Sequence, residues 1–156
     1  MEARERSAYA KRLGDAWMEG NIIAQVADAR LAQAWIQLGR YRGYSAAAGV
    51  LEGLPDAVRP AEADVEDIRS KAADARDAGV AAITEAMTQL EKAHRAADNH
   101  WTMTAQAGAA DQLLSLFGYP SYVEDAITAY RDALKGREDR PYTARIAAVL
   151  RELENR

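Results

Sequence analysis

The chain has 156 residues, of which 49% are hydrophobic and 28% charged, with a formal net charge of -4 and no cysteine. This size and balance predict one soluble globular domain, residues 1–156, that is large enough to bury a core. The lack of cysteine excludes disulfides, thiolate zinc sites and cysteine nucleophiles. The acidic net charge argues against a general nucleic-acid binder, which needs a basic face.

No stretch is apolar enough to span a membrane, and Met1–Arg12 lacks the apolar core of a signal peptide. We therefore expect a cytoplasmic protein without a membrane partner. Alanine is abundant, β-branched residues are scattered, and no segment alternates apolar with polar residues over the length of a strand. The sequence predicts an all-α fold of five to six helices, arranged as an antiparallel bundle or as an array of helical hairpins.

Three helices are expected before an elbow at 53–60, which would separate this N-terminal part from the rest. The first runs from about Ala3 to Glu19, with an apolar stripe of Ala10, Leu13 and Trp17. The second begins at the N-cap Asn21 and ends at Gly39, and the third covers about 45–52. The second helix carries the apolar residues Ile22, Val26, Ala29, Ile36 and Leu38.

The region from Pro60 to Phe117 predicts a long, alanine-rich central helix. Proline suits a first helical turn, and the acidic residues that follow favour the positive end of the helix dipole. Apolar and small residues then recur three or four positions apart: Val65, Ile68, Ala72, Ala75, Gly79, Ile83, Met87, Leu90, Ala97, Trp101, Ala105 and Gly108. One unbroken helix would be about 85 Å long. We expect either two helices separated at the polar run 98–100, which we favour, or an elongated coiled-coil oligomer.

Two further helices are expected near the C-terminus. The segment Ser121-Tyr122-Val123-Glu124 has the pattern of a capping box, and Gly136 is placed to end the helix that it begins. The last helix is expected to open at Pro141 and to bury Ile146, Val149, Leu150 and Leu153.

Two glycine elbows carry a resemblance to a known family. One is Leu38-Gly39-Arg40-Tyr41, and the other is Phe117-Gly118-Tyr119-Pro120-Ser121-Tyr122, followed by Ala126, Tyr130, Ala133 and Leu134. The second segment resembles the tetratricopeptide repeat, and the likeness covers about 21–54 and 101–136, without tandem copies at the family's period of about 34 residues. The resemblance implies a concave helical surface that binds a peptide. The alternative is an ordinary helical hairpin, whose glycine elbow packs over an aromatic ring.

A catalytic hypothesis rests on Arg95 and His100. Their spacing is similar to the active-site motif of HEPN-type ribonucleases, which are small all-α proteins. An imidazole could act as general acid or base on a ribose hydroxyl, and an arginine could stabilise the charged transition state. The alternative is a chance spacing in an arginine-rich chain.

A metal hypothesis rests on Glu91 and His94, which have the spacing of the carboxylate and imidazole ligands in di-iron helical bundles. Such a site needs a second copy of the motif and two further glutamates. Because the chain has only 2 histidines, a solvated helix face is the default interpretation, and we expect no cofactor.

Aromatic and basic side chains supply the candidates for partner binding. The segment Arg40–Tyr44 interleaves arginine with tyrosine, and the three tryptophans are either core anchors or interface contacts. The candidate partner-binding residues are Trp35, Arg40, Tyr41, Tyr44, Trp101, Tyr119 and Tyr122.

The sequence therefore predicts a non-enzymatic helical protein that acts by protein–protein contact, either with itself as a homo-oligomer or with a segment of a partner. Two alternatives stay open. One is a small HEPN-like ribonuclease, and the other is a helical DNA-packaging or regulatory module with a local basic face around Arg40 and Arg42.

Overall fold

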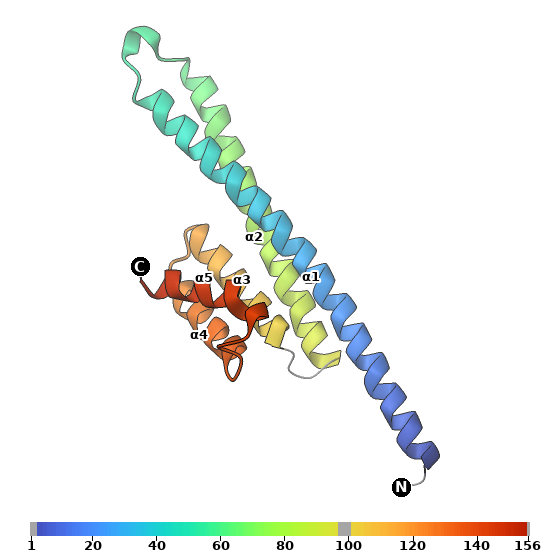
Figure 1. Cartoon of the computed structure of the whole chain (residues 1–156). Coiled ribbons are helices and arrows are strands. Elements are labelled where there is room, and N and C mark those ends of the chain that lie inside the picture. Colours follow the sequence, from blue (N-terminus) through green and yellow to red (C-terminus); the bar gives the residue numbers. More distant parts are fainter. Residues whose placement is uncertain (1–2, 97–100, 156) are drawn as a thin grey trace.

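The computed structural model describes residues 3–96 and 101–155, and within them the regular structure is helical throughout, which confirms the all-α prediction. The helices are α1 (Ala3–Glu52), α2 (Glu62–Ala96), α3 (Trp101–Leu116), α4 (Tyr122–Leu134) and α5 (Ala144–Glu154). Two short 3-10 turns, η1 (Asp56–Val58) and η2 (Pro141–Thr143), precede α2 and α5. α1 and α2 form a long antiparallel hairpin, and the other three helices form a small cluster against one side of it (Figure 1).

α1 is one helix of 50 residues, so the prediction of three helices over 3–52 is wrong. Gly39 was expected to end a helix with a positive φ, but among the described glycines only Gly118 and Gly136 have one. Asn21 does not cap a new helix, because its Nδ2 donates a hydrogen bond of 3.0 Å to the carbonyl oxygen of Trp17 within α1. A glycine inside a helix costs only about 1 kcal/mol relative to alanine. Packing along the helix outweighs that cost here.

The seam between α1 and α2 consists mainly of alanine and leucine. Its buried residues are Ala24, Ala27, Leu31, Ala34 and Leu38 from α1, and Ala82, Ile83, Ala86, Leu90 and Ala93 from α2. Small side chains let the two helices approach closely. Of the apolar residues of the second expected helix, Leu38 is buried in this seam, whereas Ile22, Val26 and Ile36 are 58%, 43% and 59% exposed.

Cross-helix ion pairs show which residues of the hairpin lie opposite each other. Arg30 contacts Glu85 at 2.8 Å, and Arg69 contacts Glu52 at 2.7 Å. Arg30 and Glu85 show how the two antiparallel helices are aligned. Counted along both helices from this pair, Ala96 at the end of α2 lies opposite about residue 19 of α1. The hairpin therefore covers only the part of α1 that follows residue 19.

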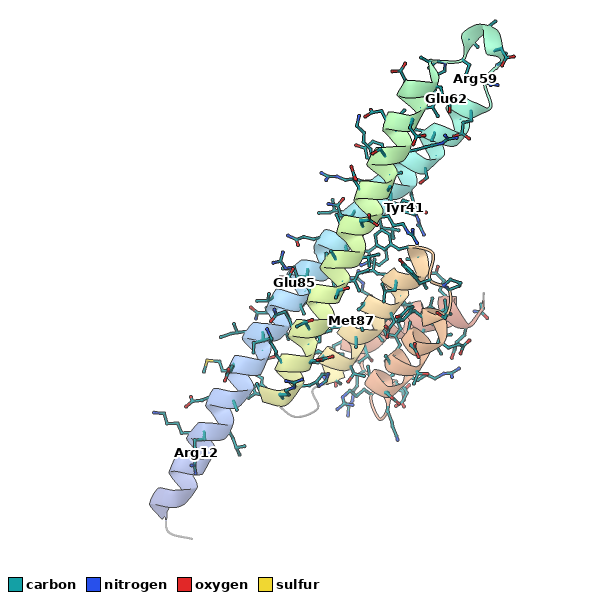
Figure 2. All side chains as sticks on the ribbon, turned by 180° about the vertical axis from the view of Figure 1, so that it is seen from behind. Arg12, Tyr41, Arg59, Glu62, Glu85 and Met87 are labelled. Atoms are coloured by element: carbon teal, nitrogen blue, oxygen red, sulfur yellow. The ribbon has the colours of Figure 1, made fainter. Side chains whose placement is uncertain are left out.

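Residues 3–19 of α1, here called the overhang, run past the end of α2. Figure 2 shows Arg12 on this part of the helix, well beyond the last turn of α2. Leu13 and Trp17, predicted to lie on a core stripe with Ala10, are 54% and 56% exposed. That prediction is wrong for Leu13 and Trp17, because no described helix of the chain covers this face.

The stretch from 60 to 117 forms two helices, α2 and α3, as favoured from the sequence. The predicted stripe is largely confirmed: Val65, Ala72, Ala75, Ile83 and Leu90 are all buried. The polar run 98–100, at which the break was expected, lies outside the described residues. The alanine-rich central helix is therefore α2, which is 35 residues long.

The junction between α2 and the C-terminal cluster is tightly packed around Phe117, which is fully buried. A Cβ atom on Gly79 would lie 2.2 Å from Cζ of this ring. Arg76 donates a hydrogen bond of 3.1 Å from Nε to the carbonyl oxygen of Phe117. Gly118 follows with a φ of 100° and turns the chain from α3 into α4.

The predicted capping box at the start of α4 does not form. Ser121 has helical backbone angles and no side-chain cap hydrogen bond. The N–H groups of Tyr122 and Val123 instead donate to the carbonyl oxygens of Tyr119 and Pro120, at 3.1 and 3.2 Å. Backbone turns thus pair the first N–H groups of α4 without a side-chain cap.

The end of α4 and the start of the next helix lie near the predicted positions. α4 ends at Leu134, and Gly136 follows with a φ of 74°. Pro141 begins the turn η2 rather than the helix itself, which starts at Ala144. α4 and α5 then share a second core of Ala126, Ile127, Tyr130 and Leu153.

Candidate functional site

A groove of about 750 Å³ lies between the long hairpin and the C-terminal cluster. One wall comes from α1, with Asp28, Leu31, Ala32, Trp35 and Arg42, and the other walls come from Ala105, Gln106, Ala109, Gln112 and Leu116 of α3, Tyr130 of α4, and Arg145, Ile146, Val149 and Glu152 of α5. α3 approaches α1 closely enough for a hydrogen bond, whereas α5 packs on α4. The space left between α1 and α5 is the groove.

Apolar side chains make up much of the lining. Trp35 is 46% exposed, although it is one of the largest side chains of the protein. Ile146 and Val149 are partly buried and reach the groove from α5, and Leu116 does so from α3. The groove therefore offers an open apolar surface with an aromatic side chain on one wall.

Two glutamine side chains give the groove polar groups. Gln106 donates from Nε2 to the carbonyl oxygen of Ala24 at 3.2 Å. Its Oε1 is buried, and no described residue donates a hydrogen bond to it. Gln112 accepts a hydrogen bond of 2.9 Å from the Tyr130 hydroxyl. These hydrogen bonds therefore connect α3 to α1 and to α4.

Burial raises the pKa of the Tyr130 hydroxyl to about 12, with Asp111 adding to this effect and Arg145 opposing it. The hydroxyl therefore stays protonated at neutral pH and remains a hydrogen-bond donor. Burial also raises the pKa of Asp111 to about 6, helped by the nearby charge of Asp125. This carboxyl group does not line the groove, and its effect is on the stability of the α3–α4 pair.

Charged residues of both signs border the groove. Asp28 and Arg42 lie on α1, separated by fourteen positions, or about 21 Å along the helix axis. Arg145 and Glu152 lie on α5. The groove therefore has an acidic end at Asp28 and a basic end at Arg42. This favours a ligand with a positive charge near Asp28 and a negative charge near Arg42.

The predicted partner-binding residues are distributed over several surfaces. Trp35 lines the groove, whereas Arg40 and Tyr44 line a shallow depression between α1 and α2. Tyr41 packs against Phe117, with the ring centroids 6.0 Å apart. Trp101 similarly packs against Tyr142 at 5.5 Å.

The remaining two candidates lie near the α3–α4 turn. Tyr122 packs against the main core, and Tyr119 lies under the guanidinium of Arg76, 5.2 Å from its centroid. Arg42 lines the groove, while Arg40 faces the other depression. The arginines of the Arg40–Tyr44 segment thus point to different sides of α1, as successive positions of a helix do.

Three of the catalytic and metal candidates, Glu91, His94 and Arg95, lie at the end of α2. Arg95 forms an ion pair with Glu91 at 3.7 Å, and both side chains are largely exposed. His94 is partly buried one turn away, and His100 lies outside the described residues. In the part of the chain that the structure describes, no three His, Asp or Glu side chains are grouped to hold a metal ion.

Sequence reasoning identified Trp35 but missed the opposite wall of the groove. Gln106 and Gln112 are two of several polar residues in α3, which also contains Asp111 and Ser115, so their residue types alone did not mark them as groove residues. Ile146 and Val149 were assigned to the core, and only the distance between α5 and α1 leaves them facing a groove.

Comparison with models of protein families, with curated proteins and with solved structures gives no match for this chain. In the described residues, no helix combines the length and apolar character needed to cross a membrane.

Proposed function

We propose that this protein acts non-enzymatically by protein–protein contact, and that the groove between α1, α3 and α5 holds a helical segment of a partner. The observation that carries this proposal is Trp35, which is 46% exposed on the wall of a groove of about 750 Å³. Tryptophan is enriched among the residues that dominate binding energy, especially where neighbouring side chains can exclude water around it.

The chemistry of the lining specifies the partner segment. Leu31, Trp35, Ile146 and Val149 favour an amphipathic helix that inserts large apolar side chains. Asp28 favours a basic residue near one end of that helix, and Arg42 favours an acidic residue near the other.

A displayed library of amphipathic helical peptides tests this proposal. Peptides selected on the purified protein are expected to lose about tenfold or more in affinity on Trp35→Ala or Val149→Glu, because each change alters the apolar lining. Trp17→Ala is the matched control, since Trp17 is also about half exposed, at 56%, but lies outside the groove. Selection of no binder, or of binders that neither groove variant weakens, would contradict the proposal.

A further inference from the structure

α1 carries a second apolar face, on the side away from the core. Two series of residues spaced by seven form it: Ile22, Ala29, Ile36, Gly43 and Val50, and Met18, Gln25, Ala32, Gly39 and Ala46. We call this set the outward stripe. All ten residues are exposed, and Met18, Ile22, Ile36 and Val50 are each more than half exposed.

The spacing of the outward stripe is that of a coiled coil. Two positions of each heptad, over four heptads, carry apolar or small residues at every place except Gln25, and they form a seam that a second helix can follow. The residues that pack against α2 lie on other positions of the heptad, among them Ala27, Ala34 and Ala48. α1 can therefore bind another helix on its outward stripe while it keeps its contacts with α2 and α3.

Two glycines of the stripe have no packing role within the chain. A Cβ atom added at Gly39 or Gly43 would meet nothing within 4 Å. Gly79 and Gly108 differ, because aromatic rings pack against them at 2.2 and 3.2 Å from the Cβ position. Glycine is less favourable than alanine inside a helix. Gly49 of α1 is equally open although it lies outside the stripe, so an open position does not by itself mark an interface; at Gly39 and Gly43 the small residue leaves room for a side chain of a second helix.

We propose that two copies of this chain pair through their outward stripes, α1 against α1, in antiparallel orientation. In the register that aligns the heptads, the two-fold axis passes near residues 30 and 31. Ile22 then lies opposite the partner's Gly39, and Met18 lies opposite the partner's Gly43. Large side chains thus face glycines, which gives the size complementarity that helix packing requires.

Charge supports the same register. Glu19 and Arg40 both flank the stripe on the same side, at equivalent heptad positions. Antiparallel pairing sets Glu19 beside the partner's Arg40, and the two-fold symmetry repeats this pair. Parallel pairing would instead set glycine against glycine at 39 and 43, which leaves a gap in the seam.

The overhang lies beside the other copy in this register, with residues 11–19 beside about residues 42–50 of the partner. The stripe positions that continue into the overhang are Lys11 and Asp15, whereas the exposed Leu13 and Trp17 lie on other heptad positions and stay uncovered by the pairing. The stripe lies beside the groove on α1 and shares Ala32 with it. The pairing depends on α1 alone, so that it does not rest on the proposed peptide binding.

Single cysteines test both the pairing and its direction, since the chain has no cysteine of its own. Sedimentation of the wild-type chain is expected to give twice the 17.1 kDa mass of one copy. Ile22→Cys and Gly39→Cys are expected to cross-link to each other when the two variants are mixed, and neither is expected to cross-link to itself. Val58→Cys is the control, because Val58 is 65% exposed at the tip of the hairpin and outside the stripe.

A charge exchange sharpens this test. Glu19→Arg or Arg40→Glu alone is expected to weaken the dimer about tenfold, because each places like charges together at two symmetric positions. The double variant is expected to restore it. A monomeric mass for the wild-type chain overturns the proposal, and self-cross-linking of Ile22→Cys overturns the antiparallel register. Val149→Glu, which alters the groove on α5 and not on α1, is expected to leave the mass unchanged, which separates this result from the test of the groove.

Discussion

The α1–α2 hairpin and the junction between α2 and the C-terminal cluster bury different kinds of side chain. Along the hairpin, the seam is mostly alanine and leucine, while Trp17, Ile22 and Ile36 are more than half exposed. At the junction, Phe117 and Leu113 are fully buried. Because burial of apolar area drives folding, the junction contributes more stability per residue. The hairpin leaves large apolar side chains accessible to other molecules.

Phe117→Ala, at the junction, is expected to have the largest effect on stability. Removal of a fully buried phenylalanine is expected to lower the free energy of unfolding by about 3–5 kcal/mol, from lost transfer energy and the cavity left behind. Urea unfolding followed by circular dichroism measures it, with the exposed Val58→Ala as control. A loss below about 1 kcal/mol would show that the junction does not dominate stability.

A second variant, Gly79→Ala, adds one methyl group to the same junction. The new Cβ atom would lie 2.2 Å from the buried Phe117 ring, so the ring or the helix must move. We expect a loss of about 1–3 kcal/mol. Gly49→Ala is the matched control, because a Cβ there meets nothing within 4 Å and alanine favours the helix by up to about 1 kcal/mol. Equal effects of the two changes would contradict the packing described for Gly79.

The third uses the raised pKa of Asp111, which is about 6 in the folded protein against an ordinary 3.8. The folded state holds this proton more tightly than the unfolded state, so its contribution to stability is present below 3.8 and is lost as the pH rises through 6. Asp111→Asn removes the ionisable group, and with it this loss of stability at rising pH. We expect the variant to gain about 1 kcal/mol relative to wild type between pH 4 and pH 7, since partial exposure reduces the full linkage value.

Unfolding of both proteins across this pH range measures the effect of Asp111. Asp132→Asn on the exposed side of α4 is a suitable control for the loss of one negative charge. A difference between variant and wild type that does not grow with pH would contradict the role given to burial of Asp111.

The smallest expected effect is that of the ion pair across the hairpin. Arg30 and Glu85 meet at 2.8 Å with 35% and 46% of their side chains exposed, so Glu85→Gln is expected to cost less than about 1 kcal/mol, and less still in high salt. Thermal unfolding at two salt concentrations measures it. Glu91→Gln is the control within one helix, where the partner is 3.7 Å away and largely exposed. A large, salt-independent loss would mean that this pair, rather than the alanine seam, holds the hairpin together.

Local signals predicted the helical class and the turns that depend on local geometry. Gly118 and Gly136 adopt a positive φ, and each lies where a helix was expected to end. Gly39 carries the same sequence signal but lies inside α1, because packing of α2 along the helix outweighs the local preference. Local chemistry alone does not distinguish these glycines.

Side-chain size does not predict which face of α1 is buried. Ile22, Val26 and Ile36 are large and exposed, whereas the small Ala27 and Ala34 are buried. The groove could not be predicted for a related reason. It depends on how α5 is held by α4, and the turn η2 fixes that placement through contacts distant from the groove.

The continuity of α1 gives the protein a fixed internal length. A single helix of 50 residues connects the overhang, the groove wall and the tip near Asp56 without a joint. Its ends are about 75 Å apart at 1.5 Å per residue. A molecule bound at Trp35 is therefore held at a fixed distance from any molecule bound at either end of α1.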